Sequence, residues 1–585
     1  MNYLNPIYTE KRECQDCYKC VRNCPVKAIK VEGGCATVIS ELCIICGHCV
    51  EVCPNGAKKV RDDLARARQL FTLKKSVYVS LAPSYASEFP DVKPARLVHA
   101  LKQLGFAGVS ETALGAQQVS AQAAALMRQN PGKVLISSAC PTVVCYLQKH
   151  RRGGAELLTP LLTPLLTHCK MLRQAFGPDI GTVFVGPCIA KKIEAAQHPE
   201  LLDVALTFED LRRWLDQEKI RLEAVAETAE DHFVPESAAE GAWFPVDGGM
   251  IAGMKSACAV NDRSLMAFSG LSAIRKALDG LEELKPDNGL FLELLACEGG
   301  CVNGPKVARH DATIIKRRRI LSSAARPEIA LPRPPQIEIA SNFAAAPPPA
   351  VQYSDSQIRE ALRTVGKYSL DDELNCGGCG YDSCREFGIA LMNQKAERSM
   401  CVTYMRKLAH KKANALIQKM PSAVVIVNDA VRIIEFNAAF ASLFAPNRGK
   451  NGDGLAALEG VALAEVMPFA NLFHSVLKTG EDILDRDLRF QNTILHAAIF
   501  TIEKHCLVGG IIQDITKPAV QKAQVIRKAR EVIQKQLATT QQIAYLLGEN
   551  AAESEITLNS IIDSFSPPKP DEPKDDHDWR KLYRR

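Results

Sequence analysis

The sequence predicts a multidomain protein with α/β and α+β parts, and three observations lead to this prediction. The chain has 585 residues, which is too long for a single hydrophobic core and suits three to five domains. Its 21 cysteines are grouped, with nine before residue 54 and four between residues 376 and 401. Between these two groups, strand-like and helix-like patterns alternate, which is typical of an α/β domain.

The first 60 residues contain two copies of one cysteine pattern. The spacing Cys-x2-Cys-x2-Cys-x3-Cys-Pro is that of bacterial ferredoxins with two 4Fe-4S clusters, in which the fourth Cys of each run ligates the other cluster. We therefore expect a two-cluster ferredoxin fold over residues 1–60. Cys35 lies outside both runs and is expected to be a buried apolar residue. One cluster is expected on Cys14, Cys17, Cys20 and Cys53, and the other on Cys43, Cys46, Cys49 and Cys24.

Charge and composition narrow the environment and the partners. Lys+Arg 72 against Asp+Glu 66 gives a net charge of +6 without a long basic block, which argues against nucleic acid as a partner. No apolar stretch reaches the ~20 residues of a membrane-spanning helix, and the first residues lack the pattern of a signal peptide. We therefore expect a cytoplasmic protein whose cysteines bind metal rather than form disulfides.

Residues 75–320 are predicted to form an α/β domain whose loops carry four cysteines. Residues 134–136 and 182–185 are strand-like, and each leads into a loop with one Cys next to a proline. A third loop, residues 295–305, places two cysteines among glycines, which let a backbone approach a bulky inorganic group. Four cysteines are the usual complement of a 4Fe-4S cluster. The four are Cys140, Cys188, Cys297 and Cys301.

These three loops resemble the signature segments of the catalytic domain of iron-only (FeFe) hydrogenases. In that family the H-cluster is a 4Fe-4S cubane joined through one shared Cys to a two-iron subcluster that carries CO and cyanide. The resemblance covers roughly residues 75–310. It implies that Cys140, Cys188 and Cys297 hold the cubane, that Cys301 bridges to the subcluster, and that Lys191 hydrogen-bonds a cyanide. Further matches lie at residues 79–83, 111–116 and 248–250.

The same loops depart from the family at three places. Catalytic members have two adjacent cysteines in the first loop, and the first of them passes protons to the subcluster, but here that place is Ala139. Gly186 stands where Met is usual, and residues 301–305 replace a glycine run. A missing acid or base typically removes a factor of ~10²–10⁴ in rate, so we expect slow hydrogen chemistry or none, as in the sensory type of the family. The alternative is a domain that keeps the cubane alone.

A small helical 4Fe-4S domain is expected over residues 354–412, after a Pro/Ala-rich linker over residues 321–353. Its spacing Cys-x2-Cys-x4-Cys-x16-Cys resembles the small 4Fe-4S domain of electron-transport complex subunits and corrinoid iron-sulfur proteins. Residues 385–398 are expected to be a helix that returns the chain to the cluster, and a zinc knuckle is the alternative. The resemblance implies the ligands Cys376, Cys379, Cys384 and Cys401, and brings the expected 4Fe-4S clusters to four.

Residues 413–517 resemble a PAS sensor domain. Residues 422–427 and 431–436 are predicted to form its first hairpin. PAS domains bind small ligands or cofactors in some proteins and only dimerise in others. The histidines that could ligate haem are expected to be ordinary surface residues. They are His474, His496 and His505.

The carboxyl-terminal end is predicted to be a helix followed by a tail. Residues 518–565 contain a long helical run whose apolar seam suits a parallel coiled coil, with a helix folded back on the PAS domain as the alternative. Residues 566–585 are charged and Pro-rich and are expected to be disordered.

Three functions are compatible with this organisation. The first is a redox or hydrogen sensor that takes electrons from a ferredoxin or hydrogenase subunit and signals, as a homodimer through the PAS domain and helix, to a downstream protein. The second is a slow hydrogenase or ferredoxin-linked oxidoreductase, in which Glu194 or Glu298 replaces the missing proton route. The third is a cluster-carrier or assembly protein without a two-iron site.

Overall fold

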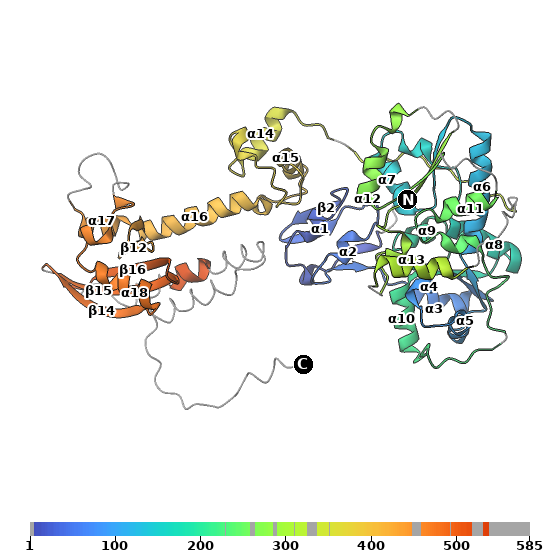
Figure 1. Cartoon of the computed structure of the whole chain (residues 1–585), viewed down its shortest axis with the longest axis horizontal. Helices are drawn as coiled ribbons and strands as arrows, with labels where there is room; N and C mark the ends of the chain where they lie inside the picture. The colour runs from blue at the N-terminus through green and yellow to red at the C-terminus, as the bar shows by residue number, and fades with distance from the viewer. Residues whose placement is uncertain are drawn as a thin grey trace. The chain divides into compact units, whose positions relative to one another are not determined.

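The computed structural model divides the chain into two compact units, Met1–Arg398 and Ser399–Arg585, which are described separately (Figure 1). Of the helix expected over residues 518–565, only residues 530–536 are described, and all of them are helical. The tail expected over residues 566–585 lies outside the described residues. The structure describes residues 5–228, 230–257, 264–284, 289–308, 311–324, 336–349, 351–446, 458–491, 493–516 and 530–536.

The ferredoxin segment of the first unit consists of two antiparallel strand pairs and two short helices. Each helix follows a loop of closely spaced cysteines, and both start after a left-handed residue, Tyr18 before the first and Gly47 before the second. The strand pairs are β1 (Ile7–Thr9) with β4 (Lys58–Val60) and β2 (Ile29–Glu32) with β3 (Cys35–Val38), and the helices are α1 (Lys19–Arg22) and α2 (His48–Glu51).

The hydrogenase-like part contains two parallel sheets, as the alternating pattern predicts. The larger has the strand order β6-β5-β8-β9 and the smaller has the order β10-β11-β7. Every residue of β8 and β11 is buried, which is typical of parallel strands covered on both faces. The strands are β5 (Val77–Leu81), β6 (Gly108–Glu111), β7 (Val134–Ile136), β8 (Gly181–Gly186), β9 (Val204–Thr207), β10 (Leu265–Ser269) and β11 (Leu290–Leu295).

Helices cover these sheets and begin where local sequence favours a start. Proline occupies the first turn of α5, α7 and α8, where its missing N–H costs nothing. Thr207 and Asp210 form a capping box at α10. The helices are α3 (Leu64–Leu73), α4 (Tyr85–Glu88), α5 (Pro94–Gln103), α6 (Ala113–Gln129), α7 (Pro141–His150), α8 (Pro164–Phe176), α9 (Lys191–Gln197), α10 (Phe208–Gln217), α11 (Gly249–Ala257), α12 (Leu271–Leu278) and α13 (Thr313–Ser322).

The Pro/Ala-rich segment packs along the hydrogenase-like part over its described residues 336–349. The Leu162 N–H donates to Ile339 O at 2.8 Å, and the Ala346 N–H donates to Gln148 O at 2.9 Å. The Ile339 side chain is only 1% exposed. This stretch therefore packs on the surface of that part along its length, which its composition, read as a linker, does not indicate. Even a Pro-rich chain can bury single apolar residues.

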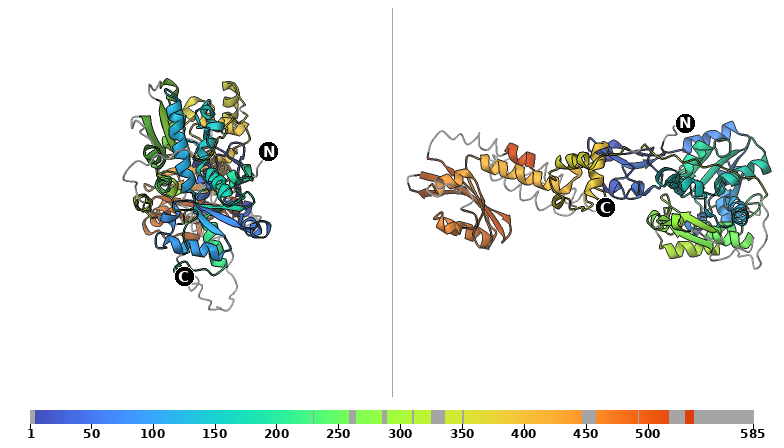
Figure 2. Two further views of the ribbon diagram at one scale, coloured as in Figure 1. Left: turned by 90° about the vertical axis from the view of Figure 1, so that its right-hand side faces the viewer. Right: turned by 90° about the horizontal axis from the view of Figure 1, so that it is seen from above.

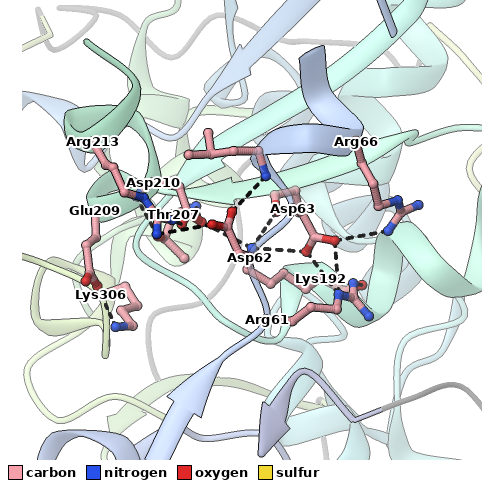
Figure 3. Close-up of polar contacts among 12 residues, drawn as sticks. Arg61, Asp62, Asp63, Arg66, Lys192, Thr207, Glu209, Asp210, Arg213 and Lys306 are labelled. Carbon is pink, nitrogen blue, oxygen red and sulfur yellow. Dashed lines mark hydrogen bonds and ion pairs between the residues drawn. The ribbon is translucent and has the colours of Figure 1, made fainter. Parts of the chain in front are cut away.

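A buried ion cluster joins the end of the ferredoxin segment to the hydrogenase-like part (Figure 3). Lys192 on α9 is fully buried, and its Nζ donates to Asp63 Oδ2 at 3.1 Å and to Asp210 Oδ2 at 3.2 Å. Asp63 also pairs with Arg61 and Arg66 at 3.0 and 3.1 Å. The cluster fixes α9, whose first residue is Lys191, relative to the chain that leaves the ferredoxin segment.

The small cysteine-rich segment contains α14 (Asp355–Arg363) and α15 (Cys384–Met392). Helix α15 ends at Met392 and a single 3₁₀ turn follows at Arg398–Met400, so the helix expected over residues 385–398 is shorter than predicted. Gln394 takes a positive φ of 55°, which breaks the helix. The expected boundary between residues 412 and 413 lies inside a continuous helix, α16 (Val402–Lys419).

The second unit contains one five-stranded antiparallel sheet in the order β13-β12-β16-β15-β14. The predicted hairpin is present, with Val425 opposite Phe436 in its register. Phe440 and Phe473 are fully buried in the core. The elements are β12 (Ala423–Val427), β13 (Ile433–Phe436), α17 (Ala438–Phe444), α18 (Ala470–Thr479), β14 (Ile483–Phe490), β15 (Thr493–Glu503) and β16 (Leu507–Asp514).

Within the described residues, no helix is both long enough and apolar enough to span a bilayer.

Candidate metal centre

Three loops bring four cysteines together at the carboxyl ends of parallel strands. Cys140 follows β7 and caps α7, and Cys188 lies between β8 and α9. Cys297 and Cys301 follow β11, which pairs in parallel with β7. The carboxyl ends of neighbouring parallel strands lie at the same edge, which brings Cys140 to Cys297 and Cys301. Strand β8 belongs to the larger sheet, and the loop that follows it adds Cys188.

The four thiols lie close enough to perturb one another. Burial, reinforced by Cys301, Cys188 and Cys140, raises the pKa of Cys297 well above its ordinary value. Burial, opposed by Lys191 and reinforced by Cys140, raises the pKa of Cys188 to about 11. Four thiolates this close repel unless positive charge lies between them, and metal ions supply such charge and deprotonate the thiols that bind them. The donor set therefore fits a cubane.

Lys191 supplies a buried cation beside these thiols. Burial alone would lower its pKa, but the charges of Glu194 and Cys188 outweigh that effect and raise it, so the ammonium stays protonated. Lys191 Nζ lies 2.7 Å from Glu194 Oε2, yet neither atom makes a well-angled hydrogen bond within the described part of the chain. A buried ammonium with one ion-pair partner has further N–H groups to satisfy, which fits a ligand with an anionic end, such as an iron-bound cyanide.

The structure shows what surrounds two of the positions that depart from the hydrogenase pattern, Gly186 and the third loop. A Cβ on Gly186 would lie 2.4 Å from Phe184 Cζ and 2.7 Å from Ala82 Cβ, so these neighbours leave no room for the usual Met. In the third loop, Asn303 Nδ2 donates to Glu298 O at 3.0 Å, and Lys316 Nζ donates to Asn303 Oδ1 at 3.1 Å. This loop is thus held by side-chain hydrogen bonds where the family uses glycines.

Glu293 is a titratable residue of this region that the sequence analysis missed. It lies in β11 and is 3% exposed. Burial raises its pKa to about 7, although its carboxylate accepts hydrogen bonds from the backbone N–H groups of Ile251, Met250 and Gly248. Its charge also acts on the pKa of Cys301. One glutamate inside the otherwise apolar run of residues 290–295 was the available signal.

The ferredoxin cysteines form the two groups that the repeated spacing predicts. Burial raises the pKa of Cys20 to about 11. Lys58 opposes this rise, and the thiols that add to it are Cys17, Cys14 and Cys53. Burial raises the pKa of Cys46 well above its ordinary value, and the thiols that add to it are Cys24, Cys49 and Cys43. These interactions follow the crossed assignment of the fourth cysteines, while Cys20 also acts on Cys49 across the two groups, and the ligand sets stay a prediction.

Two residues near the ferredoxin thiols differ from what the sequence indicates: Cys35 was expected to be buried, and Lys58 was not predicted to lie near the clusters. Cys35 is half-buried rather than buried, and its pKa is raised by burial and by an interaction with Cys14, so it lies beside a predicted ligand. Lys58 is 3% exposed, and its Nζ donates to Thr9 Oγ1 at 2.7 Å and to Ala36 O. Its charge lies near the thiols of both groups, Cys20 and Cys49.

The ferredoxin segment contacts the third loop of the hydrogenase-like part directly. A Cβ on Gly47 would lie 2.5 Å from Pro305 Cβ, so only glycine permits this approach. Cys46 and Cys297 line the same cleft of about 530 Å³, together with His48 and Glu51. The predicted ligands of neighbouring clusters therefore face one cleft, which suits transfer of single electrons between them.

The remaining cysteines differ in burial and in the element that carries them. Cys376 is exposed, Cys379 is half-buried and Cys384 starts α15, while Cys401 belongs to the second unit and caps α16. Tyr381 Oη, buried beside this loop, makes no hydrogen bond among the described residues, which fits a sulfur-rich group as its acceptor. Of the other cysteines, Cys169 is buried, Cys145 is half-buried, and Cys258 lies outside the described residues.

The three histidines considered as haem ligands lie at or near the surface of the second unit. His474 is exposed. His496 Nδ1 pairs with Asp487 Oδ1 at 2.9 Å, and His505 Nδ1 donates to Leu477 O at 2.8 Å.

Family models match three segments of the chain. Residues 75–305 match the model of the iron only hydrogenase large subunit, C-terminal domain. Residues 372–403, which contain all four cysteines predicted for the small domain, match a putative Fe-S cluster model. Residues 36–59 match a 4Fe-4S binding domain.

Individual proteins give the same assignment. Iron hydrogenase 1 of Clostridium pasteurianum is 25% identical over 316 residues, covering 43% of this chain and 54% of that protein. The NADP-reducing hydrogenase subunit HndD of Solidesulfovibrio fructosivorans is 23% identical over 381 residues, covering 52% of this chain and 64% of that protein. The chain thus spans between half and two thirds of these relatives.

A ferredoxin and a solved structure complete the comparison. The uncharacterized ferredoxin MJ0199 of Methanocaldococcus jannaschii is 41% identical over 49 residues, covering 8% of this chain and 79% of that protein. The structure of FeFe-hydrogenase HydA1 from Chlamydomonas reinhardtii is 17% identical, covers 49% of this chain and all of that chain, and has a TM-score of 0.39. The family models and these relatives show that residues 75–305 are similar to the large subunit of FeFe hydrogenases and that the amino-terminal segment belongs to the ferredoxins.

Proposed function

We propose that this protein is a hydrogen or redox sensor in which a site of the H-cluster type exchanges electrons with the ferredoxin clusters and the small Fe-S domain. The observation that carries this proposal is that the site combines a buried ammonium, Lys191, with an alanine, Ala139, at the place of the proton-carrying Cys. The buried Lys191 ammonium is ion-paired with Glu194 but makes no well-angled hydrogen bond within the described residues, which leaves N–H groups for a cyanide-bearing two-iron group. Ala139 cannot carry a proton to such a group, so turnover is slow while occupancy and redox state still change.

In this proposal the chain's residues have separate roles. The four loop cysteines hold the cubane and, through Cys301, the two-iron group, which when bound supplies the site for hydrogen. Lys191 orients that group through its cyanide. Cys46 and Cys297, which line one cleft, bring the neighbouring clusters close enough for electron transfer.

The second unit supplies the signalling part of the proposal. Its antiparallel sheet places the first strand in the middle, next to the last, in the order β13-β12-β16-β15-β14, and this arrangement supports a PAS domain. Helix α16 enters this sheet through Asn437, whose Nδ2 donates to Ile417 O at 3.0 Å and whose Oδ1 accepts from the Val424 N–H at 2.9 Å. We propose homodimerisation through this unit and a downstream signalling protein as partner.

Infrared spectroscopy tests the sensor proposal. Anaerobic protein made together with the hydrogenase maturation proteins is expected to show bands of iron-bound CO and cyanide that shift when hydrogen replaces inert gas. The Lys191→Met variant is expected to lose these bands while its cubane iron remains. Absence of the bands from the parent protein, at full cubane content, would reject the sensor and leave an electron-transfer or assembly protein.

A slow hydrogenase is the second candidate, and the position of Glu194 favours it. Glu194 pairs with Lys191 and also lines a cavity of about 360 Å³ that includes Gln197 and His198. A carboxylate between this cavity and the site can take the place of the missing thiol in passing protons. Loss of turnover in Glu194→Gln, with the infrared bands retained, would support this enzyme. Unchanged turnover would reject it.

A further inference from the structure

The small Fe-S segment contacts the ferredoxin segment at a glycine. Any larger residue at this position would push the two segments apart. Gly380, between Cys379 and Cys384, has a φ of +92°, and a Cβ there would lie 2.8 Å from Val21 Cγ1 and 3.1 Å from the Arg22 backbone nitrogen. Val21 and Arg22 belong to α1, the helix that also carries Cys20. The cluster loop of one segment therefore touches the cluster helix of the other, and in Figures 1 and 2 the yellow small Fe-S segment lies beside the blue ferredoxin segment.

Further contacts surround this point and fix the orientation of the two segments. Arg22 bridges them, because its Nη2 donates to Cys17 O at 3.0 Å and its Nη1 to Gly378 O at 3.5 Å. Lys27 pairs with Asp382 at 3.6 Å. At the outer end of the contact, the Val31 N–H donates to Lys395 O at 2.9 Å, and the Gly33 N–H donates to Glu397 Oε1 at 2.6 Å. Backbone hydrogen bonds between segments indicate fixed docking rather than a flexible tether.

Tyr381 fills the space between the predicted ligands of the two segments. Its side chain is buried at 4% exposure and packs against Phe387 with ring centroids 5.9 Å apart. Burial, then the charges of Cys379 and Cys24, raise the pKa of its phenol, so the ring lies near one ligand from each segment. Its Oη has no hydrogen-bond partner among the described residues.

The opposite side of the ferredoxin segment is fixed to the hydrogenase-like part. Besides the Gly47 contact with the third loop, Lys149 Nζ donates to Cys43 O at 2.8 Å and His150 Nε2 donates to Leu42 O at 2.8 Å. These contacts lie at the Cys43–Cys49 run, whereas the small segment contacts the chain around Cys17 to Cys24. The ferredoxin segment is thus held on two sides by two other cysteine sites.

We propose that the ferredoxin segment is a fixed electron bridge, and that Gly380 and Tyr381 form the junction through which electrons pass between Cys24 and Cys379. This inference rests on the proposed function and adds the order of transfer to it, from the hydrogenase-like site through the ferredoxin clusters to the small Fe-S domain or the reverse. Each event moves one electron, so the cluster on Cys24 is oxidised by one unit as the cluster on Cys379 is reduced by one, and no proton is exchanged. Gly380 and Tyr381 are positioning residues, since they set the distance across which the electron moves.

Electron paramagnetic resonance of the full chain reduced with dithionite tests the junction, with iron per chain measured in every sample. The parent protein is expected to show spin–spin broadening between the small-domain cluster and the ferredoxin clusters. Gly380→Val is expected to lose this broadening at unchanged iron content, because its side chain forces the segments apart. Gly366→Val is the matched control, since Gly366 has a φ of +71° and nothing within 4 Å of the added Cβ, and it is expected to keep the broadening.

Two variants of Tyr381 keep the test decisive if Gly380→Val fails to assemble its cluster. Tyr381→Ala is expected to reduce the broadening, and Tyr381→Phe to preserve it, because the ring and not the hydroxyl holds the spacing. Full iron content with unchanged broadening in Tyr381→Ala would overturn the proposal. The resonance experiment uses no hydrogen, so it is independent of the infrared test. Absent infrared bands with intact broadening would reject the sensor alone. Infrared bands that shift with hydrogen, without broadening, would reject the bridge alone.

Discussion

Replacing Lys192 by Met is expected to destabilise the hydrogenase-like part by about 3 kcal/mol, the lower end of the range for breaking a buried ion pair. Lys192 is fully buried and donates to two carboxylates and to Ala205 O. Burial by itself raises the pKa of Asp210, but Lys192 and Thr207 outweigh it and lower the pKa. The folded chain therefore holds a charged Asp210 that the substitution would leave short of a partner.

The remaining partners limit this cost. Arg66 and Arg213 stay paired with the two carboxylates, but their side chains are 53% and 45% exposed, so water screens them. A loss of about 3 kcal/mol corresponds to a shift of roughly 1 M in the urea midpoint, if m is about 3 kcal/mol per molar for a part of this size.

Tryptophan fluorescence measures this transition, since Trp214 and Trp243 are both buried in the hydrogenase-like part. Lys93→Met is the matched control, because Lys93 is 70% exposed and pairs with Glu227, and its loss is expected to stay below about 1 kcal/mol. If Lys192→Met shifted the midpoint no more than Lys93→Met, the reasoning about the buried cation would be refuted.

Four further outcomes are expected. Burial lowers the pKa of His168 to about 3 from 6.5, so the unfolded chain binds a proton that the folded chain rejects, and at about pH 5.5 stability falls by about 1.4 kcal/mol relative to neutral pH. His168→Gln should flatten this part of the urea-midpoint profile, and an equally steep profile would contradict the assignment. Ala139→Cys should raise hydrogen turnover by ~10²–10⁴ in protein that shows the infrared bands, and no gain would mean that the thiol is not the missing relay. Cys35→Ala should retain the iron of both ferredoxin clusters, and loss of iron would make Cys35 a ligand. Asn437→Ala should cost at least ~2 kcal/mol, because it leaves several buried backbone groups unsatisfied, and should lose amide-exchange protection at the start of α17; unchanged protection would argue against its linking role.

The cysteine sites were the part of this protein most predictable from sequence. Each ferredoxin run places its cysteines within a few residues of one another, so spacing alone predicts two cluster sites, and the crossed fourth cysteines stay a prediction from the motif. The strands before Cys140 and Cys188 were likewise predictable from short buried apolar runs. Local spacing also predicted the first hairpin of the second unit.

Other features depend on segments that are distant in sequence. Lys192 meets Asp63 across 129 residues, and Ile339 joins the buried cluster that contains Leu162, to which it is also hydrogen-bonded. Composition predicted a linker over residues 321–353. Composition describes the local conformational preference of a segment, and it does not indicate which distant surface the segment packs on. The helix over residues 385–398 was overextended for the same reason, as a turn at Gln394 returns the chain to the ferredoxin segment.

The sequence by itself determined which chemistry the chain can carry, because thiols at fixed spacing bind iron wherever the backbone brings them. Only the tertiary structure decided how the sites are connected. Gly47 and Gly380 look like ordinary loop glycines in the sequence, yet each is the point where one cysteine site touches the next. Contact of this kind arises from the packing of whole segments, and electron transfer depends on it because tunnelling weakens steeply with distance.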